Sequence, residues 1–242
     1  MHTGSCAICS TCRDAATALQ VEQWTDERNG GADEEAQPQG AGGGGAAAVL
    51  PDGGALQAPV HLVPCASFTP AGAVESALLT QREASALAAA LPGRYAVAEW
   101  ALRYATDSGG FSLQSLYRAG GACARSVLVV EDFGGFVFGA FVTGAWRVSP
   151  RYTGTGETFV FQLRPAALKY AWQPRPGARR NDFFVRCAAD SLGVGGAPHF
   201  ALWLDGDLLF GHSGACATFA SPVLASGEEF MVKALELWQV GR

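Results

Sequence analysis

The spacing of hydrophobic residues changes once along this chain, from a helical period to a strand period. Between residues 74 and 91, apolar side chains recur at three- and four-residue steps with alanines between them, which predicts an amphipathic helix. Pro92 and Gly93 follow, and both residues commonly end helices. The same spacing predicts a second short helix over residues 97–104.

From residue 126 onward the apolar residues follow a period of two, which is typical of β-strands. The predicted strands are 126–131, 136–143, 157–163, 169–173, 182–186, 200–204, 207–210 and 230–239. Short strands separated by Gly, Pro and Asp favour an antiparallel sandwich. Because helices come first and strands follow, we expect an α+β fold: an antiparallel two-sheet β-sandwich flanked by short helices.

Two local features of the last strands can also be predicted. Asp205-Gly206-Asp207 is predicted to form a hairpin turn, since Asp-Gly favours the positive φ of tight turns.

In the last strand, alternation places Glu236 on one face with four other residues: Phe230, Val232, Ala234 and Trp238. A carboxylate on such a face needs a partner. We therefore expect Glu236 to hold a sheet edge through a hydrogen bond or an ion pair, and we favour this role over a catalytic one.

Composition divides the chain into three segments. Residues 1–60 are predicted to be a disordered arm, because residues 26–35 are charged, residues 37–48 are mostly Gly and Ala, and little is apolar enough to offset chain entropy. Residues 61–86 are expected to be a linker and the start of the helical segment. Residues 87–242 are expected to form the folded domain.

Charge and hydropathy narrow the function classes. The 242 residues include 22 acidic and 17 basic side chains, a formal net charge of −5, which argues against a nucleic-acid partner. No stretch approaches the roughly 20 apolar residues of a membrane span. We expect a monomer in the cytoplasm, with mitochondria and nucleus as alternatives, and seven reduced cysteines.

One segment offers candidate catalytic residues: His212, Ser213 and Cys216. A hydrolase would use Ser213 with His212, and a peroxide scavenger would use Cys216. However, neighbouring residues on an extended chain point to opposite faces, and the segment has no G-x-S-x-G elbow. The structural alternative is that Ser213 and Thr218 bind the loop backbone, as short polar side chains do. We assign no catalytic residue and keep the enzyme as the alternative hypothesis.

No cofactor or metal is expected. Asp205 and Asp207 fit a turn. The glycines of 193–196 lack a phosphate-binding motif and fit a close backbone approach or a bulge. The C-x-x-C-x-x-C motif lacks a fourth ligand; its cysteines are Cys6, Cys9 and Cys12. Three further cysteines are expected to be buried and inert, with Cys216 the one to test: Cys123, Cys187 and Cys216.

A basic patch is the candidate partner-binding site. Its residues are Arg175, Arg179, Arg180 and Arg186. On an acidic protein, such a patch suits an acidic partner, since charges at the rim of an interface steer association. A solvated loop explains it equally well, and both interpretations stay open.

Several short motifs, in the right order, resemble the TLDc domain family. They are WALRYAT at 100–106, FSLQSLYR at 111–118, FGAF at 138–141, TGTGETFVF at 153–161, GHS at 211–213, CATF at 216–219 and LELW at 235–238. The residues that carry the resemblance are Gly139, Gly156, Gly195, Gly196, Trp203, Gly211, Ser213, Cys216, Thr218, Phe219, Glu236 and Trp238. The resemblance covers roughly residues 87–240.

The resemblance implies a fold and a role. The fold is two antiparallel sheets packed as a sandwich with short helices beside them. The role is protection against oxidative stress by a noncatalytic interaction domain, through a protein partner such as subunits of the vacuolar proton pump (V-ATPase).

Overall fold

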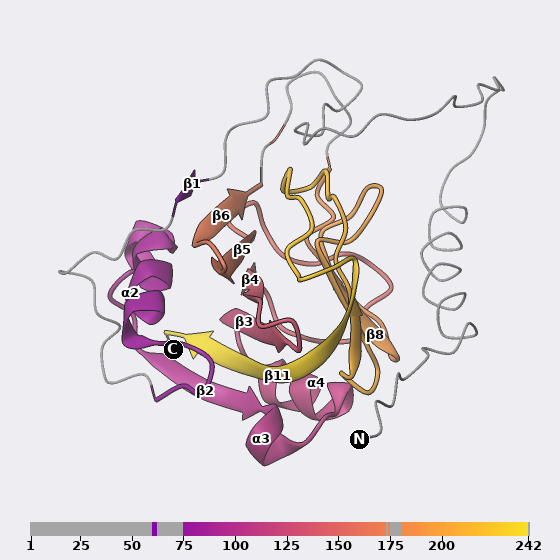
Figure 1. Cartoon of the computed structure of the whole chain (residues 1–242), viewed down its shortest axis with the longest axis horizontal. Coiled ribbons are helices and arrows are strands. Elements are labelled where there is room, and N and C mark those ends of the chain that lie inside the picture. Colours follow the sequence, from indigo (N-terminus) through magenta and orange to yellow (C-terminus); the bar gives the residue numbers. More distant parts are fainter. Residues whose placement is uncertain (1–59, 62–74, 173, 175–180, 242) are drawn as a thin grey trace, which may run out of the picture. The chain divides into compact units, whose positions relative to one another are not determined.

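The computed structural model describes residues 60–61, 75–172, 174 and 181–241 (Figure 1). Most of the predicted N-terminal arm, including Cys6, Cys9 and Cys12, lies outside the described residues. Three residues of the predicted basic patch also lie outside them: Arg175, Arg179 and Arg180.

The first predicted helix is present but shorter than its hydrophobic pattern. Helix α2 spans Gln81–Ala90. Thr80 and Glu83 form a capping box, in which the Thr80 hydroxyl accepts from the Glu83 amide and the Glu83 carboxylate accepts from the Thr80 amide. Leu78 and Leu79 are buried ahead of this cap, so the apolar period continues beyond the helix itself.

The second predicted helix is wrong. Residues Gly93–Tyr95 form one 3-10 turn, η1, and Trp100–Ala105 form strand β2. Strand β2 pairs with the last strand of the chain, and this pairing includes a register shift. Tertiary pairing therefore outweighs a local period that fitted a helix. Two short helices follow: α3 at Thr106–Gly109 and α4 at Leu113–Gly120, the latter capped by Ser112.

Most of the predicted strands are confirmed within a few residues. The strands are β1 Val60–His61, β3 Arg125–Asp132, β4 Val137–Thr143, β5 Phe159–Arg164, β6 Leu168–Ala171, β7 Val185–Cys187, β8 Ser191–Val194, β9 Leu202–Asp205, β10 Phe210–His212 and β11 Glu229–Val240. Strand β8 was not predicted as a separate element. The strand predicted at 207–210 is wrong, because residues 206–209 form the turn between β9 and β10.

That turn differs from the predicted Asp-Gly type. The positive φ belongs to Leu208, at 55°, and not to Gly206. The Asp205 carboxylate accepts hydrogen bonds from the amides of Leu209 (2.9 Å) and Phe210 (3.2 Å), so this side chain organises the turn. Gly206 is needed for close approach, since a Cβ there would lie 2.9 Å from the carbonyl oxygen of Asp190.

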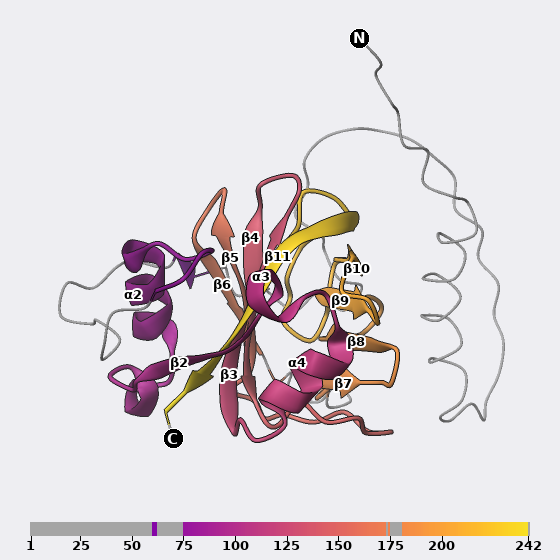
Figure 2. The same ribbon diagram turned by 90° about the horizontal axis from the view of Figure 1, so that it is seen from below.

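The strands form two antiparallel sheets that share β11. The first sheet consists of β1, β6, β5, β4, β3, β11 and β2, and the second consists of β11, β10, β9, β8 and β7. The order is β1-β6-β5-β4-β3-β11-β10-β9-β8-β7, with β2 also paired to β11. Strand β11 contacts β10 through its first residues, and β3 and β2 through its later ones. The two sheets face one another, with α2 on the outer side of the first (Figure 2). The predicted α+β sandwich is therefore confirmed.

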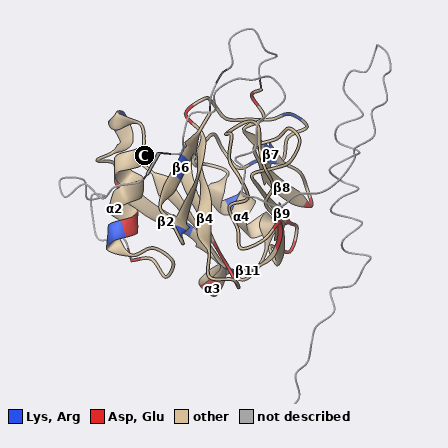
Figure 3. Cartoon of the chain, turned by 45° about the horizontal axis from the view of Figure 1, so that its top comes forward, with Lys and Arg blue, Asp and Glu red and all other residues tan. Residues whose placement is uncertain are grey.

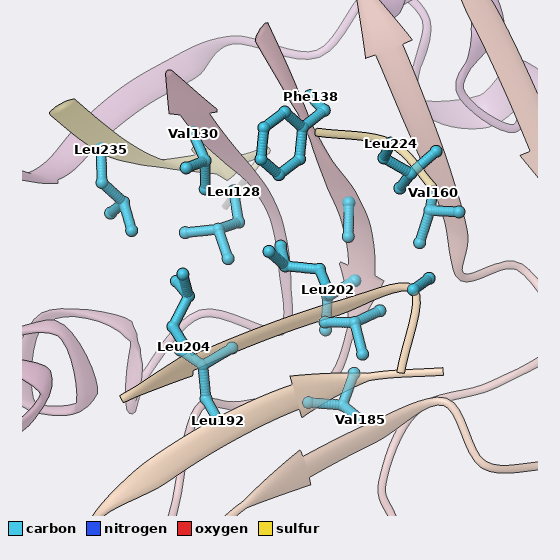
Figure 4. Packing of buried hydrophobic residues seen from close by; sticks show 14 of the residues in the cluster. Leu128, Val130, Phe138, Val160, Val185, Leu192, Leu202, Leu204, Leu224 and Leu235 are labelled. Carbon is cyan, nitrogen blue, oxygen red and sulfur yellow. The ribbon is translucent and has the colours of Figure 1, made fainter. Parts of the chain in front are cut away.

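Two hydrophobic clusters lie on opposite faces of the first sheet. One fills the space between the sheets, where Leu128, Val130 and Phe138 lie across from Leu202 and Leu204 (Figure 4). The other lies between the first sheet and α2. Strand β5 serves both clusters, as its alternation predicts, with Val160 in the first and Phe159 and Phe161 in the second.

The predicted alternation along β11 fails at one point. Phe230 and Val232 face the cluster between the sheets, but Leu235 and Leu237 face it too, whereas Trp238 belongs to the cluster beneath α2. The pairing with β3 shifts between Val232 and Ala234. A bulge adds one residue to a strand and moves all later side chains to the opposite face, which explains the error.

Candidate functional site

The loop after β8 is built around two glycines and a buried thiol. Gly195 has a φ of 86°, and a Cβ there would lie 2.5 Å from the Cys216 sulfur. The Gly196 amide donates to the Thr218 hydroxyl at 3.0 Å and approaches the Cys216 sulfur at 3.2 Å. This close approach of backbone to side chains confirms the interpretation of the glycine cluster.

The surroundings of the Cys216 thiol are typical of a structural cysteine and not of a reactive one. Its side chain is buried, and the thiol donates to the Gly196 carbonyl at 3.4 Å. Burial raises the pKa of the Cys216 thiol, against the opposing effect of nearby amides. A thiol with a raised pKa stays protonated near neutral pH and is a poor nucleophile. Cys123 and Cys187 are buried as well, as predicted, and burial raises the pKa of Cys187 to about 11.

The Ser213 hydroxyl both donates and accepts a hydrogen bond within the domain. It donates to the Ala201 carbonyl at 2.7 Å and accepts from the Leu224 amide at 2.8 Å. Thr218 also bonds the loop, through Gly196 and through the side-chain oxygen of Asn181 at 2.8 Å. These contacts confirm that Ser213 and Thr218 bind the backbone of the loop.

His212 lies on the outer face of β10, away from Ser213. Its register partners are Trp203 on β9 and Glu229 on β11, and its ring centroid is 6.0 Å from that of His199. Burial lowers the pKa of His212, and His199 lowers it further, whereas Glu228 and Glu229 raise it. The Nε2 atom is buried without a hydrogen-bond partner. Within the described residues, no hydrogen bond joins His212 to Ser213 or Cys216.

Glu236 is buried on strand β11. Its carboxylate accepts hydrogen bonds from the Ala77 amide at 2.8 Å, from the Ser76 hydroxyl, and from Trp238 Nε1 at 2.9 Å. The prediction of a hydrogen-bonded carboxylate is confirmed. The prediction of a sheet edge is wrong, since β11 has paired strands on both sides. No sequence pattern predicted that Ser76 would bind Glu236, because the two residues lie 160 positions apart in the chain.

Asp132 is a second buried carboxylate, which the sequence analysis missed. Its two oxygens accept from the amides of Phe136 (2.9 Å) and Ser226 (2.8 Å). It thereby joins the β3–β4 turn to the loop that precedes β11. An Asp directly before a turn that contains Gly134 and Gly135 was the available signal.

Of the predicted basic patch, Arg186 is the one residue that the structure describes. Its guanidinium donates to the Pro150 carbonyl and lies 6.0 Å from the ring centroid of Tyr152. This contact holds Arg186 against a neighbouring loop. With the other arginines outside the described residues, the patch stays a prediction.

Several remaining signature residues are glycines at close contacts. A Cβ on Gly139 would lie 1.9 Å from the Leu128 carbonyl oxygen, and one on Gly156 or Gly211 would meet the ring of Trp172 or Phe230. Phe219 is buried in the core. The part of the chain that the structure describes holds no group of three or more metal-ligating side chains, and none of its helices is long and apolar enough to cross a membrane.

These observations define a class of protein: a two-sheet sandwich domain in which the residues that carry the family resemblance stabilise the fold. The family model described as TLDc domain matches residues 73–241. The chain therefore belongs to the TLDc family.

Individual relatives agree with this assignment. The chain is 38% identical to Nuclear receptor coactivator 7 of Homo sapiens over 165 residues, which are 67% of this chain and 17% of that protein. It is also 38% identical to Oxidation resistance protein 1 of Rattus norvegicus over 174 residues, 71% of this chain and 20% of that protein. The chain thus spans about a fifth of the length of these relatives.

Proposed function

We propose that this chain is a noncatalytic interaction domain, monomeric and cytoplasmic, which protects against oxidative stress by binding subunits of the V-ATPase. Two relatives from different vertebrates bear the name Oxidation resistance protein 1, which supports the stress-related part of the proposal. Membership of the TLDc family supports an interaction role.

The noncatalytic part of the proposal rests on the contacts of the three candidate catalytic side chains: His212, Ser213 and Cys216. Ser213 both donates and accepts a hydrogen bond inside the domain, and the Cys216 thiol is buried with a raised pKa. His212 approaches neither of them closely enough for a hydrogen bond among the described residues. A nucleophile needs an adjacent base or a lowered pKa, so these residues favour structural roles and leave function to the surface.

Binding to the proton pump can be tested with purified components. The full chain would be immobilised and exposed to the purified soluble sector of the V-ATPase. We expect capture by the wild type. Failure to retain any pump subunit would reject this partner.

The same assay tests the basic patch. Reversal of Arg175, Arg179 and Arg180 to Glu would reduce capture if the patch docks the partner. The matched control changes the same net charge at three exposed arginines elsewhere: Arg82, Arg118 and Arg151. Equal capture by both triple variants would remove the patch from the proposal without removing the partner.

The noncatalytic part has a separate test. Ester hydrolysis and peroxide consumption would be measured for the wild type, Ser213→Ala and Cys216→Ser. We expect no activity above the uncatalysed rate in any of them. An activity of the wild type that a folded Ser213→Ala or Cys216→Ser variant loses would contradict the proposal and favour the enzyme.

A further inference from the structure

Three exposed apolar side chains form a row across β10, the first residues of β11 and the turn that follows β3. Phe210 on β10 is the register partner of Met231 on β11, and the Phe133 amide donates to the Met231 carbonyl at 3.1 Å. Directly opposed residues on antiparallel strands place their side chains on the same face, a few ångströms apart. Phe133, Met231 and Phe210 are 69%, 47% and 43% exposed. We name these three residues, with neighbouring Leu209 at 42%, the apolar row.

The residues on either side of the apolar row are polar. On one side, His212 is paired across the strands with Glu229. On the other side, Lys233 of β11 forms an ion pair with Glu131 of β3 at 3.0 Å. The apolar row is therefore bounded by charged side chains, which is the arrangement of a protein interaction site with a polar rim.

The rim is strongly acidic. Five carboxylates that are not buried lie within four sequence positions of a residue of the apolar row: Glu131, Asp205, Asp207, Glu228 and Glu229. Within the same described positions, Lys233 is the one Lys or Arg. Figure 3 shows acidic residues along β11 and beside β9. Asp205 is tied to the row itself, since its carboxylate accepts from the amides of Leu209 and Phe210.

We infer that the apolar row is the docking surface for a protein segment that presents apolar side chains together with Lys or Arg. Charge decides between the candidate occupants. Residues 1–59 of this chain hold eight acidic and two basic residues, so the chain's own arm repeats the charge of the rim. A second copy in a symmetric dimer would likewise bring acidic rim against acidic rim. A basic, amphipathic partner satisfies both features of the surface.

The inference rests on the proposed function only in that the domain binds a protein, and it does not require the V-ATPase. Its probe is therefore a short synthetic peptide of Leu and Lys in an amphipathic helical pattern, labelled with fluorescein. The matched peptide replaces every Lys with Glu. Binding to the full chain is measured by fluorescence anisotropy at low and physiological salt.

We expect the Leu/Lys peptide to bind the wild type and the Leu/Glu peptide to bind much more weakly. The double variant Phe210→Ser/Met231→Ser should lose about tenfold or more in affinity, since both side chains would be covered in the complex. The matched control, Val97→Ser/Val148→Ser, alters two apolar residues that are 68% and 60% exposed elsewhere and should keep wild-type affinity. Glu229→Lys should weaken binding more at low salt than at high salt.

Thermal melting checks that each variant is folded, and Glu229→Lys tests the surface without removing an apolar side chain. The inference is overturned if the Leu/Lys peptide does not bind, if both peptides bind equally, or if the Phe210/Met231 variant binds like the Val97/Val148 control. Sedimentation of the chain alone provides one further outcome. A dimer that dissociates in the Phe210/Met231 variant would assign the row to a second copy.

The two proposals fail separately. If the proton pump does not bind but the Leu/Lys peptide binds as described, the partner is wrong and the surface stands. If the pump binds equally to wild type and to the Phe210/Met231 variant, and the peptide shows no preference, the partner stands and the surface is wrong.

Discussion

The backbone amide of Ala77 donates a 2.8 Å hydrogen bond to the carboxylate of Glu236, 159 positions later in the chain. Trp238 and Ser76 also donate to this carboxylate. The contact joins the segment before α2 to the central strand β11, so the beginning and the end of the domain depend on one buried side chain.

Replacing Glu236 with Gln should lower the free energy of unfolding by about 2 kcal/mol. All three partners of Glu236 are donors, and the amide of Gln would present its own N–H groups to one of them. Urea denaturation measures the loss. The control is Glu229→Gln on the same strand, an exposed position where we expect a change within about 0.5 kcal/mol. Equal effects at both positions would contradict the role of Glu236.

The Glu236 contact also predicts where the domain must begin. A chain starting at residue 73 keeps Ser76, Ala77 and all of α2, and it should melt close to the full chain. A chain starting at residue 87 loses these donors, the buried side chains of Leu78 and Leu79, and the capping box. We expect it to be several kcal/mol less stable, from buried area and lost hydrogen bonds together. Similar melting curves for the two chains would show that this segment contributes little.

Gly139→Ala should be strongly destabilising, by about 2–4 kcal/mol. The new Cβ would overlap the Leu128 carbonyl oxygen, and a backbone atom within the paired strands β3 and β4 cannot move away without disturbing their register. Gly93→Ala is the control, because no atom lies within 4 Å of its Cβ position and its φ is not positive. Denaturation curves of both variants test the prediction, which fails if they coincide.

His212 should make the stability fall as the pH falls through about 6.5. Burial and His199 lower the pKa of His212 in the folded chain below its ordinary value near 6.5 in the unfolded chain. Above 6.5 both states are neutral and the histidine has no effect. Below it the unfolded chain takes up a proton that the folded chain resists, so the free energy of unfolding falls until the pH passes the folded pKa and then stays at the lower level. His212→Gln should remove this component from unfolding curves measured between pH 7.5 and 5.5, and parallel curves for wild type and variant would exclude it.

The Cys216 thiol should resist alkylation in the native chain. Iodoacetamide at mildly alkaline pH should leave the peptides that contain Cys187 and Cys216 unmodified, and urea should expose both to rapid labelling. Mass spectrometry of the digest gives the extent at each site. Native labelling of Cys216 as fast as a free thiol would show an accessible thiolate and revive the peroxide-scavenger hypothesis.

The two spacings of apolar residues, helical and strand-like, were enough to predict most elements of the fold. The helix within 74–91 follows from apolar residues at three- and four-residue steps, and the strands β3, β4 and β5 follow from their short runs of apolar residues. The division of β5 between two clusters follows from alternation, because side chains on a strand point to opposite faces in turn. The structural roles of Ser213, Thr218 and the glycines near 195 were also predictable from side-chain chemistry. The apolar row was not, since Phe133 and Met231 are far apart in the sequence and their exposure depends on which strands lie beside them.

By itself, the sequence determined the class of fold and the family, because periodicity and a series of small motifs are local properties. Only the tertiary structure decided that residues 100–105 form a strand, that a bulge in β11 reverses the faces of its side chains, and that Glu236 meets Ala77. Each of these depends on pairing between distant segments. Such pairing fixes register and burial, and no local pattern encodes it.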